Sequence, residues 1–483
     1  MTSRSKKSAE AIVAARRRAE REGELKDMLL EHASHQKPGQ PGRTGGRRGE
    51  AELETGRDEA GSVRGDRESS GRGDLLRQAL ARENLVLAWK RVKANRGSAG
   101  VDGLSIDATA DYLKSDWPRI RADLLAGGYR PQPVRRVQIP KSNGGMRELG
   151  IPTVTDRLIQ QALLQVLQPR IDPTFSEHSY GFRPGRRAHD AVLKAQRYVQ
   201  EGYRVVVDVD LEKFFDRVNH DVLMHRLSKR IKDKAVLRLI RRYLQVGVMD
   251  NGVAMERYEG TPQGGPISPL LANVLLDEVD RELEQRGHRF VRYADDCNVY
   301  VHSQKAGERV LRGMRKLYDQ LHLKVNEAKT AVTSAFGVKF LGYSLWLNPW
   351  GKVRRAVAAP AIKAFKRRIR QITRRNRGRS LSDVAADLRR YLLGWKAYFR
   401  LAQTPRIFRS LDEWLRRRRR ALQLRHWRRG TTAYRELRAM GARREQAAAV
   451  AAGTRRWWHT SLGELHKLMP IAYFDRLGVP RLL

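Results

Sequence analysis

Hydrophobic and polar positions divide the chain into stretches of different character. Residues 1–35 carry the pattern of a charged helix. Residues 36–73 hold almost no large apolar side chain and are predicted to be disordered. From residue 75 to about 345, strand-like alternation and helical spacing of apolar residues follow one another, which predicts an α+β domain. Beyond residue 361 the spacing is helical, most clearly over 388–399 and 407–424.

Two adjacent carboxylates, Asp295 and Asp296, stand between two apolar runs at 290–292 and 297–301. This pattern predicts two strands joined by a tight turn that holds both acids. Adjacent carboxylates repel each other unless a cation neutralises them, so a divalent metal is their natural partner. A pair of acids in a hairpin is, taken alone, more often a solvated turn. Two-metal nucleotidyl transfer requires this pair and one more carboxylate.

A third carboxylate is available at the end of the β-branched run 204–210. Asp208 and Asp210 both belong to that run, and strand alternation places them on one face. Spacing alone therefore does not choose between them. A lone aspartate at a strand end is usually a helix cap, but the combination with the later pair is harder to dismiss.

Two cations flank an Asn-Gly turn in the segment 139–147, which predicts a hairpin with Lys141 and Arg147 on its two sides. Cations in this position suit a triphosphate, although a surface hairpin with solvated charges is the plainer alternative. Phe215 follows Asp210 by five residues, and a bulky ring near a metal ligand excludes a ribose 2′-hydroxyl. The alternative is that Phe214 and Phe215 fill the core.

The segment 261–269 places two glycines among three prolines. Such a loop is rigid and lets another backbone or a base approach closely at Gln263 and Gly264. Competing catalytic motifs are missing from the sequence: it has no G-x-S-x-G elbow, no phosphate-binding P-loop, no H-E-x-x-H and no C-x-x-C.

The formal net charge is +43, and residues 351–483 alone hold 35 basic and 8 acidic residues. Such an excess indicates a polyanion partner, and interleaved Trp and Tyr favour nucleic acid over a solvated face or a membrane surface. No apolar run approaches the ~20 residues of a spanning helix. The run 416–420, with Arg416, Arg418 and Arg420, is the densest basic segment. The shorter cluster 183–187 is expected to contact the template backbone through Arg183, Arg186 and Arg187.

The single cysteine, Cys297, excludes intrachain disulfides and cysteine-based zinc sites. The first residues contain no apolar stretch of a secretory signal, so a cytoplasmic protein is expected.

From about residue 75 onward the sequence resembles the group II intron-encoded reverse transcriptases, also called maturases, of bacteria. The motifs that carry the resemblance appear in the family's order: IPKSNGGMRELGIPTVTDRLIQ, HSYGFRPGRRAHDA, VVVDVDLEKFFDRVNH, TPQGGPISPLLANVLLDEVD, RYADDCNVYV, FLGY and GWKAYF.

The resemblance implies an α+β right-hand polymerase followed by an α-helical thumb. It implies that Asp210, rather than Asp208, joins Asp295 and Asp296 in binding two Mg²⁺ ions. Six further positions carry family roles. Lys141 and Arg147 would bind the triphosphate. Gln263 and Gly264 would contact template and nucleotide. Phe215 would be the steric gate. Lys329 lies where a basic residue stands near the leaving pyrophosphate.

The implied domains are an N-terminal extension over 1–74, fingers and palm over 75–345, a thumb or maturase domain over 346–430 and a maturase-specific region over 431–483. The implied partners are group II intron RNA, template RNA, primer DNA and deoxynucleoside triphosphates, with no membrane. The sequence contains no Cys/His-rich endonuclease module, so second-strand nicking is not expected.

Two other functions compete with a reverse transcriptase that also assists splicing and supports retrohoming by target-primed DNA synthesis. One is a stand-alone reverse transcriptase, against which the C-terminal maturase-like region argues. The other is an RNA-binding splicing factor with an inactive polymerase. The intact acid pair and the TPQGG segment argue against that, because a decayed site loses its carboxylates first.

Overall fold

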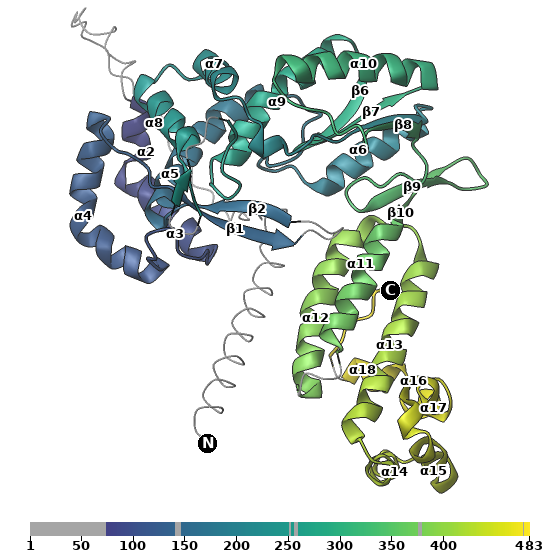
Figure 1. Cartoon of the computed structure of the whole chain (residues 1–483). Helices are drawn as coiled ribbons and strands as arrows, with labels where there is room; N and C mark the ends of the chain where they lie inside the picture. The colour runs from purple at the N-terminus through teal and green to yellow at the C-terminus, as the bar shows by residue number, and fades with distance from the viewer. Residues whose placement is uncertain (1–73, 141–145, 251–252, 256–258, 375–378, 477) are drawn as a thin grey trace, which may run out of the picture. The chain divides into compact units, whose positions relative to one another are not determined.

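A computed structural model describes residues 74–140, 146–250, 253–255, 259–374, 379–476 and 478–483 (Figure 1). The expectations for residues 1–73 and the position of Lys141 lie outside these residues. The described chain forms two compact units. Unit 1 holds the residues through Ala191 together with Val207–Val299 and Glu308–Ala331, and unit 2 holds Val192–Val206, Tyr300–Gly307 and Val332–Leu483.

Unit 1 contains a group of helices, several of which pack against one buried helix, α5 (Val154–Ile171). The other helices of this group are α2 (Asp74–Ala79), α3 (Arg82–Ala94), α4 (Ile106–Ala126), α7 (His220–Arg230) and α8 (Lys234–Gln245). Most of the 18 residues of α5 are buried, and α2 and α3 pack against it. The side chain of Thr153 caps α5 by accepting from the amide of Asp156. The buried Asp156 carboxylate accepts the hydroxyl of Tyr243 (3.2 Å), which ties α5 to α8, and the hydroxyl of Tyr129 (2.8 Å), which ties α5 to the segment after α4.

One four-stranded sheet lies beside these helices, in the order β2-β1-β4-β5. Its strands are β1 (Val134–Pro140), β2 (Met146–Ile151), β4 (Val248–Asp250) and β5 (Val253–Met255). β1 and β2 are antiparallel, with Pro140 opposite Met146 and Ile139 opposite Arg147. The pairing confirms the hairpin predicted over 139–147.

A second four-stranded sheet has the order β6-β7-β3-β8. Its strands are β3 (Val205–Val209), β6 (Arg289–Tyr293), β7 (Asp296–Val301) and β8 (Ala331–Ser334). Successive strands β6 and β7 are neighbours, so Asp295 lies in the turn between them, and β3 is the next strand. Helix α9 (Ser268–Gln285) packs against β6, and α10 (Gln304–Gln320) follows β7. Val207 and Val299 are fully buried in the sheet interior.

Unit 2 begins with part of α6 (Ala188–Gln200) and an antiparallel hairpin of β9 (Tyr343–Leu347) and β10 (Val353–Val357). Helices complete it: α11 (Ala359–Ile372), α12 (Leu381–Tyr398), α13 (Pro405–Trp427), α14 (Gly430–Ala439), α15 (Arg444–Ala452), α16 (Trp457–Thr460), α17 (Glu464–Leu468) and α18 (Ile471–Arg476). Short 3-10 turns cover Asp172–Thr174, Phe214–Asp216, Phe399–Leu401 and Thr454–Arg456.

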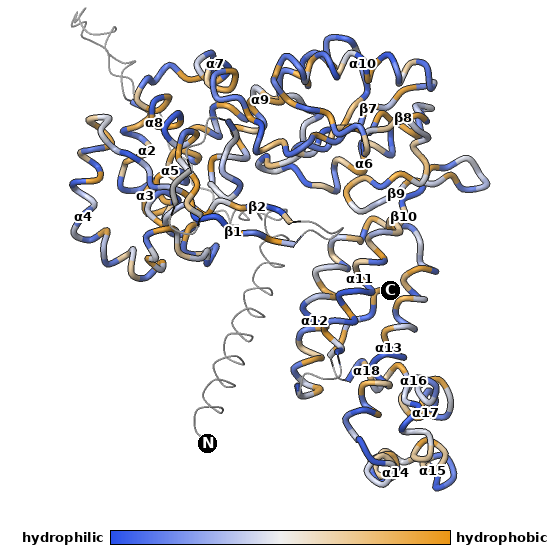
Figure 2. Tube along the Cα trace, viewed as in Figure 1, coloured by the Kyte–Doolittle hydropathy of each residue, from blue (hydrophilic) through white to orange (hydrophobic). Residues whose placement is uncertain are grey.

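Aromatic side chains hold the longer helices of unit 2 together. Trp395 of α12 lies 4.6 Å from Phe365 of α11 and 5.9 Å from Phe408 of α13, measured between ring centroids. Apolar and polar positions alternate along α11, α12 and α13, as expected of helices that bury one face (Figure 2). Leu437, Val450 and Leu465 form part of a separate small core among α14, α15 and α17.

The predicted fold class, an α+β polymerase followed by a helical domain, is confirmed by this arrangement of sheets and helices. The domain boundaries named above stay predictions. Among the described helices, none is long and apolar enough to cross a membrane.

Candidate active site and nucleic-acid interface

The turn that carries Asp295 is held from inside by a buried arginine. Ala294 has a φ of 58°, the left-handed conformation that a tight turn requires here. The guanidinium of Arg292 donates to the Ala294 carbonyl at 2.9 Å. It also forms an ion pair of 2.6 Å with Asp280 of α9, and both side chains are fully buried. The position of the turn is therefore fixed by α9.

Arg292 remains charged in this setting. Burial alone would lower its pKa, but the Asp280 carboxylate raises the pKa above its ordinary value. The remaining donors of the guanidinium reach Asn273 Oδ1 (2.9 Å) and Ser179 Oγ (2.8 Å). A buried ion pair is tolerated only when its other donors and acceptors are satisfied, and these contacts satisfy them.

Gly181 packs directly against the same turn. A Cβ atom at this position would lie 2.1 Å from the amide nitrogen of Ala294, so no larger residue fits without movement of the turn. The Asn273 side chain donates to the Gly181 carbonyl at 2.9 Å, and the amide of Tyr180 donates to the Arg292 carbonyl at 2.8 Å. The segment SYGF thus supports the turn from a second side.

Asp210 follows β3 and lies half-buried beside the loop that precedes β8. Its Oδ2 atom accepts hydrogen bonds from Lys329 Nζ and from Asn326 Nδ2, each at 3.0 Å. Its backbone carbonyl accepts from the Asn326 amide at 2.8 Å. The Asp210 carboxylate is therefore already bound by a cation and by a side-chain amide of the protein itself.

Asp295 and Asp210 lie in one electrostatic neighbourhood. Burial raises the pKa of Asp295; the nearby Arg147 guanidinium lowers it and the Asp210 carboxylate raises it. Asp296 is exposed at the start of β7. The charge of Asp208, by contrast, acts on the buried thiol of Cys297 inside the sheet. The structure thus brings Arg147, Asp210 and Asp295 together.

Within the described residues, no group of three or more His, Cys, Asp or Glu side chains is arranged as a metal site. The residues nevertheless suit a cation. The Asp210 carboxylate holds the Lys329 ammonium at 3.0 Å, and the Asp295 carboxylate is destabilised by burial and by its acidic neighbour. A divalent ion would relieve that repulsion.

The loop with Gln263 and Gly264 lies against β2. Arg147 Nε donates to Gln263 Oε1 at 2.7 Å, and the Gly150 amide donates to the Gln263 carbonyl at 3.0 Å. Gly264 has a φ of 138°, and a Cβ there would lie 2.6 Å from the Gly150 carbonyl. The close approach that the glycines permit is therefore that of β2, and it joins Arg147 to the loop.

Phe214 and Phe215 are both largely buried and pack edge to face with ring centroids 5.1 Å apart. Phe215 is the more accessible of the two, at 9% against 3%. Its carbonyl accepts the amide of Thr261 at 2.7 Å, which links the Phe215 backbone to the start of the glycine loop.

The cluster 183–187 divides into buried and exposed arginines. Arg183 is 8% exposed; it pairs with Asp172 at 2.9 Å and donates to the Ser179 carbonyl at 3.1 Å. Its donors are committed to the protein, so this geometry argues against the expected contact with a template backbone. Arg186 is half-buried and lies over the Tyr180 ring, whereas Arg187 is exposed.

The arginine run on α13 departs further from expectation. Arg420 is 2% exposed and donates to the Met469 carbonyl at 3.0 and 3.2 Å. Arg416 and Arg418 are half-buried, and Arg418 Nε donates to Thr373 Oγ1 at 3.0 Å. Five consecutive residues exceed the 3.6 residues of a helical turn, so part of the run must face inward. Arg420 supports the fold here and is not placed to bind RNA.

Three cations instead surround one aromatic ring on α11 and α13. The charged groups of Lys366, Arg370 and Arg418 lie 5.8, 5.6 and 5.4 Å from the centroid of the Trp414 ring. Arg370 is exposed, and the other two cations are half-buried. Like charges gathered on one ring attract a polyanion, because each phosphate reduces their mutual repulsion.

Sequence reasoning missed the residues that position the carboxylates. Arg292 was visible as a lone charge in an apolar strand, and Asp280 as an acid on the apolar side of α9, but sequence spacing did not pair them. Gly181 lay in a recognised motif without an assigned role. Asn326 stood three residues before Lys329, in a segment that resembles the family, without an assigned role.

Two family models match this chain. One, described as "Reverse transcriptase (RNA-dependent DNA polymerase)", covers residues 139–345. The other, described as "Group II intron, maturase-specific domain", covers residues 362–441. The first match includes the carboxylates, the glycine loop and Lys329, and the second includes the Trp414 cluster.

The chain is also similar in sequence to several curated proteins, two of which are named as intron proteins. The chain is 33% identical over 334 residues to Protein YkfC of Escherichia coli (strain K12), which covers 60% of this chain and 88% of that protein. It is 30% identical over 349 residues to the group II intron-encoded protein LtrA of Lactococcus lactis subsp. cremoris, covering 58% of each. It is 28% identical over 331 residues to the putative COX1/OXI3 intron 2 protein of Saccharomyces cerevisiae, covering 56% of this chain and 38% of that protein.

Proposed function

Because this chain belongs to the family of group II intron-encoded reverse transcriptases and maturases, we propose that Asp210, Asp295 and Asp296 form the catalytic centre of its RNA-directed DNA polymerase. The observation that carries the proposal is the shared electrostatic neighbourhood of Asp210 and Asp295, with Arg147 acting on the same carboxylate. Asp210 directly follows β3, Asp295 lies in the turn between β6 and β7, and Asp296 begins β7; the three strands belong to one sheet.

The acids would hold magnesium. When bound, Mg²⁺ supplies the positive charge that activates a primer 3′-hydroxyl and neutralises triphosphate oxygens. Asp210 and Asp295 would orient the hydroxyl end of the primer, and Asp296, exposed at the start of β7, would face the triphosphate. Lys329 Nζ donates to Asp210 Oδ2 at 3.0 Å, so its ammonium lies beside the proposed centre, where it would meet the leaving pyrophosphate.

Arg147 is proposed to bind the incoming deoxynucleoside triphosphate. Gln263 accepts the Nε–H of Arg147, which leaves the two terminal nitrogens of the guanidinium for phosphate oxygens. Lys141, which the sequence places across the Asn-Gly turn from Arg147, is proposed to bind the same triphosphate. Gly264 keeps the loop close to β2, and Gln263 would contact the template and nucleotide.

Phe215 is proposed as the steric gate against ribonucleotides. Its ring is more accessible than that of Phe214, and its carbonyl is fixed by Thr261. A gate must not move when a 2′-hydroxyl presses on it, and packing against Phe214 provides that stiffness.

The helical region is proposed to bind group II intron RNA, assist its splicing and support retrohoming by target-primed DNA synthesis, with template RNA and primer DNA as further partners. The match to a maturase-specific domain supports this proposal, together with the cations around Trp414. The proposed domain limits remain 1–74, 75–345, 346–430 and 431–483.

A primer-extension assay on an RNA template tests the catalytic assignment. The Asp295→Asn variant keeps the shape of the turn but lacks the carboxylate charge. We expect it to lose DNA synthesis while binding the template-primer with an affinity within a few-fold of wild type. Undiminished synthesis by Asp295→Asn would refute the proposed centre.

A further inference from the structure

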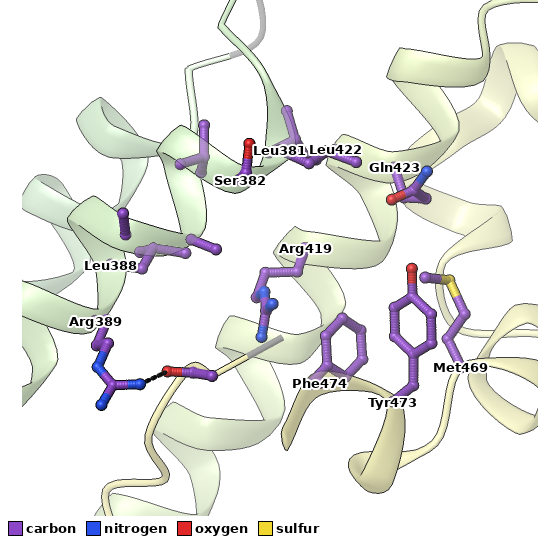
Figure 3. Close-up of a pocket in the computed structure, with 14 residues that line it drawn as sticks. Leu381, Ser382, Leu388, Arg389, Arg419, Leu422, Gln423, Met469, Tyr473 and Phe474 are labelled. Atoms are coloured by element: carbon purple, nitrogen blue, oxygen red, sulfur yellow. Dashed lines mark hydrogen bonds between the residues drawn. The ribbon is translucent and has the colours of Figure 1, made fainter. Parts of the chain in front are cut away.

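The helical unit contains a cavity that the polymerase site does not use. It has a volume of about 390 Å³ and lies among α12, α13 and α18 (Figure 3). This volume falls within the range of roughly 300–1,000 Å³ of small-ligand sites. Most of its lining is apolar, with Leu388, Leu422, Met469 and Phe474 among its walls.

One charged side chain occupies the middle of this apolar lining. Arg419 is 8% exposed, and its guanidinium lies 4.5 Å from the centroid of the Phe474 ring. Figure 3 shows Arg419 between Leu388 and Arg389 on one side and Phe474 and Tyr473 on the other. Burial lowers the pKa of Arg419 to about 10, so the group remains a cation at neutral pH.

Arg419 differs from its neighbours in its hydrogen bonds. Arg420 donates to the Met469 carbonyl, and Arg389 donates to the Gly478 carbonyl at 3.2 Å. Among the interactions recorded for the described residues, Arg419 has the Phe474 ring as a partner but no hydrogen bond and no ion pair. The Arg419 nitrogens are not among the fully buried, unpartnered side-chain atoms of the described residues, so its five N–H donors reach open space and are available to a ligand.

Part of the cavity wall comes from the C-terminal segment of the sequence. Met469, Phe474 and Gly478 contribute to its wall from the C-terminal segment. That segment is fastened to α13, because the Asp412 carboxylate accepts the amide of Leu482 at 3.1 Å. The chamber is therefore built by the fold and does not depend on a loose surface loop.

A matching ligand needs an anionic group for Arg419 and a flat body for the apolar walls. It also needs polar edges, because Gln423, Tyr473 and Ser382 add an amide and two hydroxyls to the lining. An unpaired nucleotide of RNA has all three properties: a phosphate, a planar base, and donors and acceptors at the base edge. Single-stranded RNA is commonly recognised by bases splayed out against aromatic and arginine side chains.

We propose that this cavity receives one unpaired nucleotide of a bound RNA, with its phosphate on Arg419. The inference rests on the proposed RNA-binding function and adds to it a defined site on the helical unit. RNA is favoured over a free metabolite because residues 351–483 hold 35 basic and 8 acidic residues, which attract a polyanion.

The test uses the full chain and a short unstructured oligoribonucleotide that carries one 2-aminopurine. Arg419→Gln removes the buried cation, and Arg425→Gln removes an exposed cation from the same helix. Wild type should change the 2-aminopurine fluorescence on binding. Arg419→Gln should weaken binding by about tenfold or more, as expected for a lost charge-assisted hydrogen bond. Arg425→Gln should bind within about twofold of wild type, with only a slightly smaller salt dependence.

A second variant separates the pocket from the fold. Ala385 lines the cavity from α12, and Ala385→Phe fills it while Arg419 stays in place. We expect Ala385→Phe to weaken the same binding as Arg419→Gln does. The thermal midpoint of Arg419→Gln should change little, because Arg419 makes no recorded hydrogen bond or ion pair within the described residues that the substitution would break. A marked fall in that midpoint, with binding by Ala385→Phe intact, would make Arg419 structural and overturn the proposal.

The remaining outcomes are also decisive. If wild type binds the RNA and copies a primed template, but Arg419→Gln binds as wild type does, the pocket inference fails and the proposed function stands. If wild type neither binds the RNA nor extends a primer, the proposed function itself fails. If inorganic phosphate displaces the oligoribonucleotide from the cavity as readily as adenosine 5′-monophosphate does, the site takes a free anion and the nucleotide assignment is refuted.

Discussion

The two charged regions of this molecule differ in where their charged side chains point. In the sheet of unit 1, the half-buried carboxylate of Asp210 is met by Lys329, and the turn with Asp295 is fixed by the buried Arg292. On α13 of unit 2, an arginine run that resembles a surface patch turns part of its charge inward, with Arg420 2% exposed. Charge in a turn can converge on one point, whereas consecutive charges on a helix must point around the whole axis.

The largest effect is expected when the two aspartates at the end of the β3 segment, Asp208 and Asp210, are replaced one at a time. Asp210→Asn should reduce RNA-templated DNA synthesis by about a thousandfold, or ~4 kcal/mol of activation free energy, because it removes a proposed metal ligand. Asp208→Asn should reduce synthesis by much less, since the charge of Asp208 acts on the buried Cys297. Steady-state primer extension measures both. Equal losses in the two variants would contradict the assignment of Asp210.

The support beneath the turn predicts the next largest effect. Arg292→Met leaves the Asp280 carboxylate buried and unpaired, which should lower the free energy of unfolding by about 3–5 kcal/mol. Urea unfolding measures this loss, and the double variant Arg292→Met/Asp280→Leu should recover much of it. A single variant as stable as wild type would show that the ion pair does not hold the turn.

The same variant has a predicted pH dependence. Burial already raises the pKa of Asp280 above its ordinary value, and removal of Arg292 raises the pKa further. A carboxyl whose pKa is raised in the folded state is least harmful when protonated. The stability lost in Arg292→Met should therefore be complete at pH values above the raised pKa, and it should shrink as the pH falls from that raised pKa toward the ordinary pKa of an aspartate.

Two arginines of α13, one buried and one exposed, are expected to contribute differently to stability. Arg420→Met removes two hydrogen bonds to the Met469 carbonyl and should destabilise the protein by about 1–3 kcal/mol. Arg425→Met changes an exposed cation on the same helix and should stay within about 0.5 kcal/mol of wild type. Thermal unfolding followed by circular dichroism compares them. Equal stability of the two variants would mean that the buried Arg420 guanidinium does not stabilise the folded protein.

The smallest expected effect concerns sugar selectivity. Phe215→Val opens space beside the proposed gate and should raise the use of ribonucleotides relative to deoxyribonucleotides by about tenfold. Phe214→Val, at the more deeply buried ring, should leave that ratio near the wild-type value. Single-nucleotide incorporation with each triphosphate measures the ratio. A gate at Phe215 is ruled out if both variants retain the wild-type ratio.

Much of the fold and the cluster around Asp295 could be predicted from the sequence. The strands around the acid pair, the hairpin at 139–147 and the helical character beyond 361 follow from local spacing of apolar residues, and such spacing is contained in short segments. Long-range partners could not be predicted in this way. Arg292 and Asp280 are twelve residues apart on different elements, and Asn326 reaches Asp210 across 116 positions, so only the fold shows that they meet.

The arginine run at 416–420 shows a second limit of sequence-based prediction, which concerns the burial of charged residues. Composition correctly indicates that the C-terminal third is strongly basic, but it does not say which side of a helix is covered by other elements. Arg183 and Arg420 were both assigned to nucleic acid by charge alone, and the structure gives each a set of internal acceptors. The cations around Trp414 come from two helices and therefore form no contiguous motif.

The measurement that tests the central claim most directly is splicing of a transcript from this gene's own locus at moderate magnesium, with primer extension measured on the same preparations. Wild type, Asp295→Ala and the triple variant Lys366→Gln/Arg370→Gln/Arg418→Gln would be compared. We expect Asp295→Ala to accelerate splicing without copying RNA, and the triple variant to copy a short primed template without accelerating splicing. If wild type copies RNA and neither it nor Asp295→Ala accelerates splicing, the separation of polymerase and maturase functions between the two regions is contradicted, and a stand-alone reverse transcriptase is the better account.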